Sequence, residues 1–164
     1  MSAATLAIVW HSRTGAAQAM ARAAAAGARA VAPAVRLLAA ARVRPDELAA
    51  ATGYLFVCPE NLGSLSGAMK EMFDRAYYPL LGRIEGRPYA TAIAAGSDGR
   101  GAEAQIDRIV TGWRLRRVAE SLIVCLDAQT PAQILAPKHV CAADLARSRE
   151  LGATLMAGLA MGVF

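Results

Sequence analysis

Short apolar runs alternate along this chain with longer segments of helical character, and this alternation constrains the fold more than any other feature. Each run is rich in valine, isoleucine and leucine and is apolar at nearly every position, as in strands buried on both faces of a parallel sheet. The runs are 5–10, 34–38, 54–58, 89–94 and 121–125. Helices are expected over roughly 16–29, 65–80, 102–114 and 142–160, and a short one could begin at Pro45. Regular alternation of strand and helix predicts a doubly wound α/β sheet.

The number of strands fits a five-stranded parallel sheet of order 2-1-3-4-5 with helices on both faces. No repeat or low-complexity linker divides the chain, so we expect a single domain over 1–164. Pro33 precedes the second run and Arg36 interrupts it, which an edge strand tolerates. Ligands of such sheets bind beyond the carboxyl ends of the strands. The loops after the first, third and fourth strands are therefore where we expect the functional site.

The loop after the first strand leads directly into a helix and carries two hydroxyl side chains, Ser12 and Thr14. Gly15 allows backbone N–H groups to approach a ligand closely. The N-terminus of the following helix adds unpaired N–H groups and the positive end of its dipole, so the loop suits a phosphate. The alternative is a plain Ser/Thr helix cap with no ligand.

Two more loops follow strands that would end at the same edge of the sheet. The first, from Pro59 to Lys70, is polar and longer than a simple connection requires. The second, residues 95–101, has three glycines in its last six residues. Such a backbone could lie flat against a ring edge, or it could be a flexible turn. Three loops at one edge predict a binding site more strongly than any one of them does.

These loops carry a resemblance to known families. Residues 12–17 resemble the flavodoxin phosphate loop, S/T-x-T-G-x-T, and the 96–101 turn is similar to that of quinone reductases related to the tryptophan-repressor-binding protein. Residues 59–74 resemble the P-E-Y-N-x-S-x-P-G-x-L-K-N-x-x-D signature of NAD(P)H-dependent FMN reductases. That signature is matched at Pro59, Glu60, Ser64, Gly67, Lys70 and Asp74. The resemblance covers roughly 4–126 and implies a flavodoxin-like three-layer sandwich.

The resemblance also implies a cofactor and a reaction. The first loop would hold the phosphate of FMN, and the other two would line its isoalloxazine ring. NAD(P)H would be the electron donor, and a small molecule such as a quinone or free flavin the acceptor. The flavin carries the chemistry in such proteins, so no catalytic side chain and no metal ligand is assigned. The implied cofactor-binding residues are Ser12, Arg13, Thr14, Gly15, Ala16, Ala17, Pro59, Glu60, Asn61, Leu62, Gly63, Ser64, Ala95, Gly96, Ser97, Asp98, Gly99 and Gly101.

Three departures from the family pattern refine this expectation. Ala17 stands where a hydroxyl residue is usual, and a lost hydrogen bond to a charged group costs about 1.5–3 kcal/mol, or roughly tenfold to a hundredfold in affinity. Asn61 and Leu62 replace Tyr-Asn, which leaves the ring loops without an aromatic residue. The net charge is +5, whereas carrier flavodoxins tend to be acidic. The last two departures favour a reductase. An electron carrier and a non-enzymatic binding protein stay as alternatives.

This chain lacks the sequence motifs of other protein classes that are built on similar sheets. A receiver domain needs paired acids after the first strand, and a P-loop NTPase needs Gly-Lys-Ser/Thr. A nicotinamide-binding Rossmann domain needs G-x-G-x-x-G at the same place. A small tyrosine phosphatase needs an arginine six residues after its cysteine, but Ser64 follows Cys58 and Pro131 follows Cys125 at that spacing.

Composition limits partners and location. The arginines are scattered and aromatic residues make up 5%, so no nucleic-acid partner is expected. Three arginines interrupt the most apolar stretch, 20–41, so no membrane insertion is expected. The start of the chain lacks a basic signal region, which favours the cytoplasm. Cys58, Cys125 and Cys141 are widely spaced and are each expected to be small buried residues.

Self-association is the last expectation. Members of the reductase branch commonly complete the flavin site as a homodimer or homotetramer. The helix after the second loop carries more large apolar residues than one face needs, although packing on the sheet is the alternative. These residues are Met69, Met72, Phe73, Tyr77 and Tyr78. Residues 127–140 have no assignment beyond an extended excursion around Pro131 and Pro137.

Overall fold

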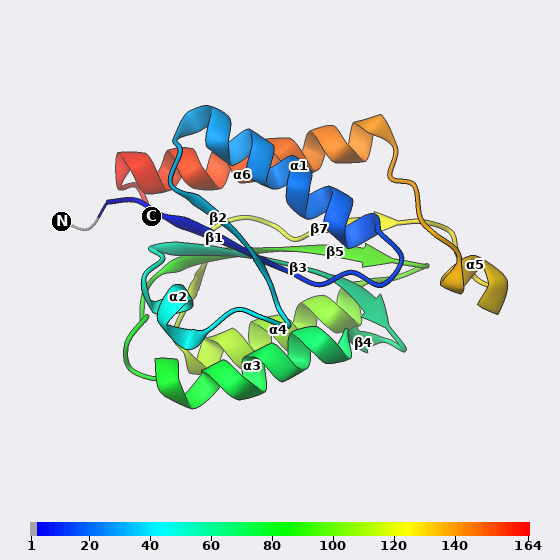
Figure 1. Cartoon of the computed structure of the whole chain (residues 1–164), viewed down its shortest axis with the longest axis horizontal. Coiled ribbons are helices and arrows are strands. Elements are labelled where there is room, and N and C mark those ends of the chain that lie inside the picture. Colours follow the sequence, from blue (N-terminus) through cyan, green and yellow to red (C-terminus); the bar gives the residue numbers. More distant parts are fainter. Residues whose placement is uncertain (1–2) are drawn as a thin grey trace.

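A sheet with helices on both faces forms the body of the protein, and the computed structural model describes residues 3–164 of it. Figure 1 shows α1 and α6 on one face and α2, α3 and α4 on the other. The elements are β1 (Leu6–Trp10), α1 (Ala16–Val31), β2 (Val35–Ala39), α2 (Pro45–Ala49), β3 (Gly53–Asn61), β4 (Ser64–Leu65), α3 (Gly67–Leu80), β5 (Pro88–Ala95), α4 (Arg100–Gly112), β6 (Arg116–Arg117), β7 (Leu122–Cys125), α5 (Pro131–Leu135) and α6 (Ala142–Met161).

The predicted strand order is confirmed. The parallel strands run β2-β1-β3-β5, and both β6 and β7 then pair with β5. The expected fifth strand is β7, the short strand β6 before it is an addition on the same edge of β5, and β3 carries an extra antiparallel partner, β4. These two differences explain why the sheet has seven strands instead of five. β2 lies at the edge, where Arg36 points to solvent, as expected for that run.

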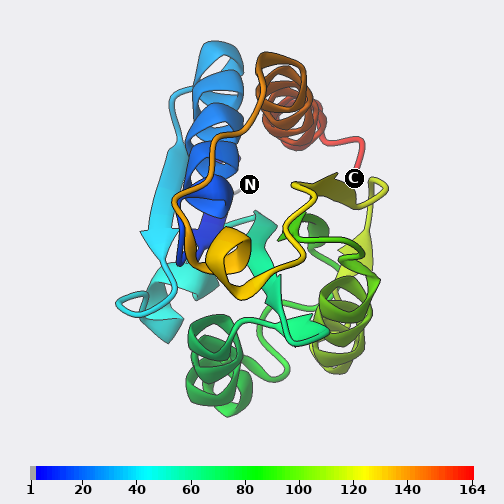
Figure 2. The same ribbon diagram turned by 90° about the vertical axis from the view of Figure 1, so that its right-hand side faces the viewer.

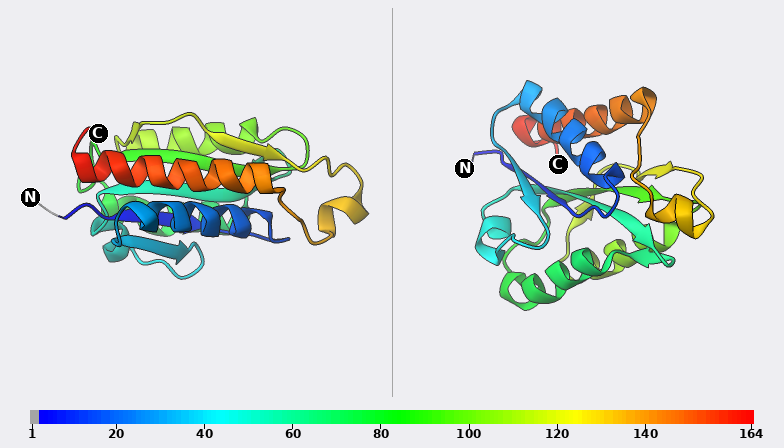
Figure 3. Two further views of the ribbon diagram at one scale, coloured as in Figure 1. Left: turned by 90° about the horizontal axis from the view of Figure 1, so that it is seen from above. Right: turned by 45° about the vertical axis from the view of Figure 1, so that its right-hand side comes forward.

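The two faces of the sheet bury different kinds of side chain, because successive residues of a strand point to opposite faces. Along β3, Phe56 packs with the core shared by α3 and α4, which also holds Phe73 and Trp113. Leu55 packs on the other face, against α1 and α6. That second core is rich in alanine, which lets α1 and α6 lie side by side at short range (Figure 3).

The predicted polar loop after the third strand is wrong, because this segment is a β-hairpin. β3 continues to Asn61 and pairs with β4 through Glu60↔Leu65 and Asn61↔Ser64. Leu62 and Gly63 form the two-residue turn, with φ of 53° and 71°. Left-handed backbone at both turn positions matches the right-handed twist of the two strands.

The segment between the last strand and the last helix contains a helix that the sequence analysis did not assign. α5 begins with a capping box, in which the Thr130 amide donates to Gln133 Oε1 (3.1 Å) and the Gln133 amide donates to Thr130 Oγ1 (3.3 Å). No residue of α5 is buried. Figure 2 shows α5 in front of the strand ends, apart from the other helices.

The expectation for the cysteines is correct for only one of them. Cys58 is buried in β3, and burial raises the pKa of its thiol to about 12. Cys125 and Cys141 are exposed. Cys125 ends β7 at the sheet margin, and Cys141 precedes α6, so neither position is covered by a helix.

The apolar residues of α3 mostly pack on the sheet. Met69, Met72 and Phe73 are buried in the core, whereas Tyr78 is largely exposed. Within residues 3–164, no helix has the length and apolar character needed to cross a membrane.

Candidate functional site

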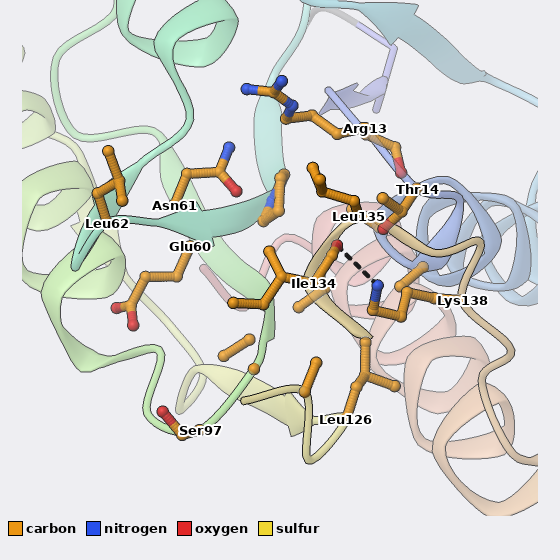
Figure 4. A pocket seen from close by; sticks show the side chains of 18 of the residues that line it. Arg13, Thr14, Glu60, Asn61, Leu62, Ser97, Leu126, Ile134, Leu135 and Lys138 are labelled. Atoms are coloured by element: carbon orange, nitrogen blue, oxygen red, sulfur yellow. Dashed lines mark hydrogen bonds between the residues drawn. The ribbon is translucent and has the colours of Figure 1, made fainter. Parts of the chain in front are cut away.

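A cavity of about 420 Å³ lies at the carboxyl ends of β1, β3 and β5. All three loops singled out in the sequence meet there. Because parallel strands end at the same edge, loops that are far apart in the chain become neighbours in space. The strap, which we define as residues 126–138 and which includes α5, crosses the same edge (Figures 2 and 4).

Most of the predicted cofactor-binding residues line this cavity. They are Ser12, Arg13, Thr14, Ala16, Ala17, Pro59, Glu60, Asn61, Leu62, Gly63, Ala95, Gly96 and Ser97. The structure places five predicted residues outside its lining: Gly15, Ser64, Asp98, Gly99 and Gly101. Six lining residues were not predicted: Ala94, Leu126, Ala128, Ile134, Leu135 and Lys138.

The phosphate loop, residues 12–17, presents backbone donors to the cavity. Gly15 is the N-cap of α1 with φ of 102°, and its amide donates to Ser12 Oγ at 3.1 Å. The first helical hydrogen bond of α1 runs from Ala19 N to Gly15 O. The amides of Ala16, Ala17 and the next residue therefore precede the hydrogen-bond ladder and can donate to a ligand.

Two side chains of this loop complete the donor set, and one expected donor is missing. The Ser12 hydroxyl accepts from the loop itself, so its proton is available to a ligand. Thr14 adds a second hydroxyl at the cavity wall. Ala17 is buried and lines the cavity with a methyl group, so the cavity wall has no hydroxyl donor at this position.

Glu60 holds the hairpin and the start of α4 together. Its carboxylate accepts from the amide of Gly99 at 2.9 Å and from the amide of Ala102 at 3.0 Å. A carboxylate at a helix N-terminus is stabilised by the helix dipole. Both oxygens are thereby occupied, so Glu60 is a scaffold for the cavity rather than a free acid or base.

The glycines of the 95–101 loop serve close packing. Gly99 is the left-handed N-cap of α4, with φ of 93°. A Cβ on Gly101 would overlap the carbonyl oxygen of Gly63, and one on Gly96 would lie 2.6 Å from the carbonyl oxygen of Ala128. Gly101 thus lets the hairpin approach the loop, and Gly96 lets the strap approach it.

The strap reaches the phosphate loop through Lys138. The amide of Lys138 donates to Thr14 O at 2.8 Å. Its ammonium donates to three carbonyl oxygens near the end of α5, those of Gln133 (2.6 Å), Ile134 (2.9 Å) and Ala136 (2.6 Å). Figure 4 shows Ile134 in the middle of the cavity view, between Lys138 and the hairpin.

The sequence contains a signal for the start of α5, but nothing that indicates where α5 lies in the fold. Thr130 and Gln133 have the spacing of a capping box, and Pro131 suits the first helical position. This pattern predicts a helix start. Nothing in it indicates that the helix would lie over loops more than 30 residues away in the chain.

The charge around the cavity is positive. Arg13 and Lys138 line it, and neither forms an ion pair among the described residues. The N-terminus of α1 adds its dipole. With both oxygens of Glu60 bound to amides, the cavity suits an anionic group such as a phosphate.

His11 is a structural residue beside the cavity. Its Nδ1 lies 2.7 Å from Oγ of the buried Ser66. Burial, and then the nearby charge of Arg13, lower the pKa of His11 from its ordinary value, which favours the neutral ring. Among residues 3–164, no group of three metal-binding side chains is close enough to hold an ion.

The geometry fits FMN, with phosphate donors at one end and small or aliphatic residues at the other. The cavity volume also falls in the range of ordinary ligand sites, roughly 300–1,000 Å³. The fold and site together define an α/β protein with a nucleotide-type pocket at its switch point.

Comparison with known proteins agrees with this class. The family model for NADPH-dependent FMN reductase matches residues 40–120, which include the hairpin, β5 and α4. No curated protein sequence matches the chain.

Solved structures with the same fold span nearly the whole chain. A flavodoxin from the domain Archaea has a TM-score of 0.76 at 16% identity, covering 94% of this chain and 98% of that one. A flavodoxin, WrbA-like protein from Agrobacterium tumefaciens has a TM-score of 0.71 at 20% identity, covering 97% and 99%. A flavone reductase has a TM-score of 0.73 at 16% identity, covering 94% and 62%. These likenesses show that the chain has the flavodoxin-like fold.

Proposed function

We propose that this protein is an FMN-binding oxidoreductase that takes electrons from NAD(P)H and passes them to a quinone or to free flavin. One observation carries the proposal. The phosphate loop, the hairpin and the 95–101 loop meet around one cavity that has phosphate donors at one end, in a chain whose centre matches an FMN reductase model.

The residues of the cavity have separate roles in this proposal. The amides of Ala16 and Ala17, with the hydroxyls of Ser12 and Thr14, bind the phosphate. Glu60 fixes the distance between the hairpin and α4 through its two amide contacts. When bound, FMN would supply the hydride chemistry, and the protein supplies orientation and local electrostatics.

Two features support a reductase over an electron carrier. No aromatic side chain lines the cavity, and Ala17 removes a phosphate donor. Both weaken the hold on FMN, which suits an enzyme that exchanges flavin more than a carrier that must retain it. The positive surroundings also differ from the acidic surface expected of carrier flavodoxins.

The first test is a titration of the purified protein with FMN, followed by flavin fluorescence and visible absorbance. Saturable binding is expected, followed by oxidation of NADH or NADPH in the presence of FMN and a quinone. An FMN complex that ignores both nicotinamides and accumulates a stable semiquinone would assign the chain to the electron carriers. A folded protein that binds no FMN would contradict the proposal.

We also propose that the protein self-associates as a homodimer or homotetramer. Tyr78 and Leu81 are large apolar side chains that lie exposed near the end of α3. Light scattering with and without FMN tests this. A monomeric mass under both conditions would contradict it.

A further inference from the structure

α5 is a short helix that buries none of its side chains. Ile134 and Leu135 keep 50% and 71% of their surface exposed. A five-residue helix is not stable through its own hydrogen bonds, because helix nucleation is unfavourable. Most helices of this protein are held by a buried apolar face, so α5 needs another source of order.

The chain supplies that order through polar contacts around α5. The capping box of Thr130 and Gln133 fixes its start. The ammonium of Lys138 binds three carbonyl oxygens at its end. The backbone of Lys138 is tied to Thr14 in the phosphate loop, and the carbonyl of Ala128 packs against Gly96. The strap is therefore fixed at both ends to loops of the cavity.

The apolar side chains of α5 face the cavity, not the protein core. Ile134 and Leu135 both line it, and Figure 4 shows Ile134 directed into its middle. No aromatic residue lines the cavity to cover the face of a ring. A ligand in the cavity would therefore supply the apolar surface against which these two side chains pack.

We propose that α5 forms a further wall of the flavin site, in which Ile134 contacts the isoalloxazine ring and Lys138 acts as a positioning residue that holds α5. This inference rests on the proposed function. The role assigned to Lys138 is to bind α5 carbonyls, not the phosphate, because each of its three protons already has a carbonyl acceptor.

The test measures the affinity of each protein for FMN and for riboflavin, which has the same ring and no phosphate. Flavin fluorescence titrations compare the wild type with Ile134→Ala and Lys138→Met. If the flavin ring covers the exposed half of Ile134, the Ile134→Ala variant should lose about fivefold in affinity, equally for the two flavins. Lys138→Met is expected to weaken the binding of both flavins by a common factor of similar size. Lys138→Arg should restore part of the lost affinity.

Lys70→Met is the matched control. It removes the same charge from the only other lysine of the chain, which lies on α3 in an exposed pair with Asp74. Its flavin affinities should equal those of the wild type. Because α5 packs against no core residue, the variants at Ile134 and Lys138 should also keep the wild-type melting temperature without flavin.

A second measurement needs no variant. Hydrogen exchange of the α5 amides of Ile134 and Ala136 should slow when FMN is added, while exchange in the middle of α6 stays constant. Both amides bond only within α5 and its two capping residues, to Thr130 O and Ala132 O, so their protection reports the order of this helix.

The possible outcomes separate the two proposals. If the wild type binds FMN but Ile134→Ala binds both flavins unchanged, the ring contact is wrong and the proposed function stands. If Lys138→Met loses affinity for FMN alone, the ammonium is a phosphate ligand and its positioning role is wrong. If FMN leaves exchange in α5 unchanged, the wall is wrong. A wild type that binds neither flavin overturns the proposed function, and this inference with it.

Discussion

Leu62 is the residue with the most unusual conformation at the cavity. It has φ of 53° at the first position of the hairpin turn, and its side chain is fully exposed. Left-handed backbone costs a residue other than glycine roughly 1–2 kcal/mol, and asparagine tolerates it better. Leu62→Asn should therefore raise the free energy of unfolding by about 0.5–1 kcal/mol in urea denaturation. Leu62→Ala keeps the strain and should show no gain. A destabilised Leu62→Asn would mean that the leucine has a packing partner.

Ala17 is the residue at which the phosphate loop departs from the flavodoxin pattern that it resembles. Its buried methyl group lines the cavity beside free helix amides. Ala17→Ser would add a hydroxyl donor, and a hydrogen bond to a charged group predicts roughly tenfold or more in FMN affinity. The gain should be absent for riboflavin, which lacks the phosphate. Equal affinity of both proteins for FMN would indicate that the phosphate does not reach Ala17.

His11 makes the stability of the protein depend on pH. Burial and Arg13 lower its pKa in the folded state, so at a pH well above the ordinary value of 6.5 the ring is neutral in both states and has no effect. As the pH falls below 6.5, the unfolded chain takes up the proton first, and the free energy of unfolding decreases until the lower folded pKa is passed. In urea denaturation, the free energy of unfolding should fall less between pH 7.5 and pH 5.5 in His11→Gln than in the wild type. His139→Gln, at an exposed position, is the control. Equal losses in all three proteins would contradict this assignment.

The close contact between the helices α1 and α6 contributes to the free energy of unfolding. A Cβ on Gly27 would overlap the carbonyl oxygen of Arg149, and one on Gly152 would overlap that of Ala24. Alanine is normally better than glycine within a helix by about 1 kcal/mol. Here the overlap reverses the sign, and Gly27→Ala should lower the free energy of unfolding by about 1–3 kcal/mol.

Gly67→Ala is the control for this prediction. Gly67 opens α3, and a Cβ there would meet nothing within 4 Å. Its substitution should be neutral or slightly stabilising in the same denaturation experiment. If Gly27→Ala is also stabilising, the two helices can separate without cost and the close contact is not a source of stability.

For the whole molecule, a ligand at the cavity should stabilise the fold, because it joins segments that are distant in the chain. Any ligand that binds only the folded state adds about 2.7 kcal/mol at a concentration of 100 times its Kd. For a chain of this length the gain corresponds to a rise in Tm of roughly 5–10 °C. A thermal melt with FMN should show this rise, and adenosine monophosphate, a nucleotide without the flavin ring, should give a smaller one. Equal shifts would indicate a general phosphate site.

The strands and helices could be predicted from the sequence because their signals are local. Continuous apolar runs such as 54–58 indicated the strands, and the longer helix-like stretches 16–29 and 142–160 match α1 and α6 to within a few residues. The phosphate loop was visible because its hydroxyls and glycine lie next to one another at a helix start. Most residues of the cavity wall follow from the rule that parallel strands end at one edge.

The remaining features depend on contacts between distant segments, so they appear only in the tertiary structure. The sequence could not indicate that Glu60 binds the amides of α4, because its partners lie about 40 residues away. It likewise could not place Ile134 and Lys138 over the cavity, although a capping box was readable at Thr130. Local sequence determines which element a segment forms, through hydrogen bonding and side-chain periodicity. Which elements meet is decided by burial of the whole chain, and here that burial brings the strap to the cavity.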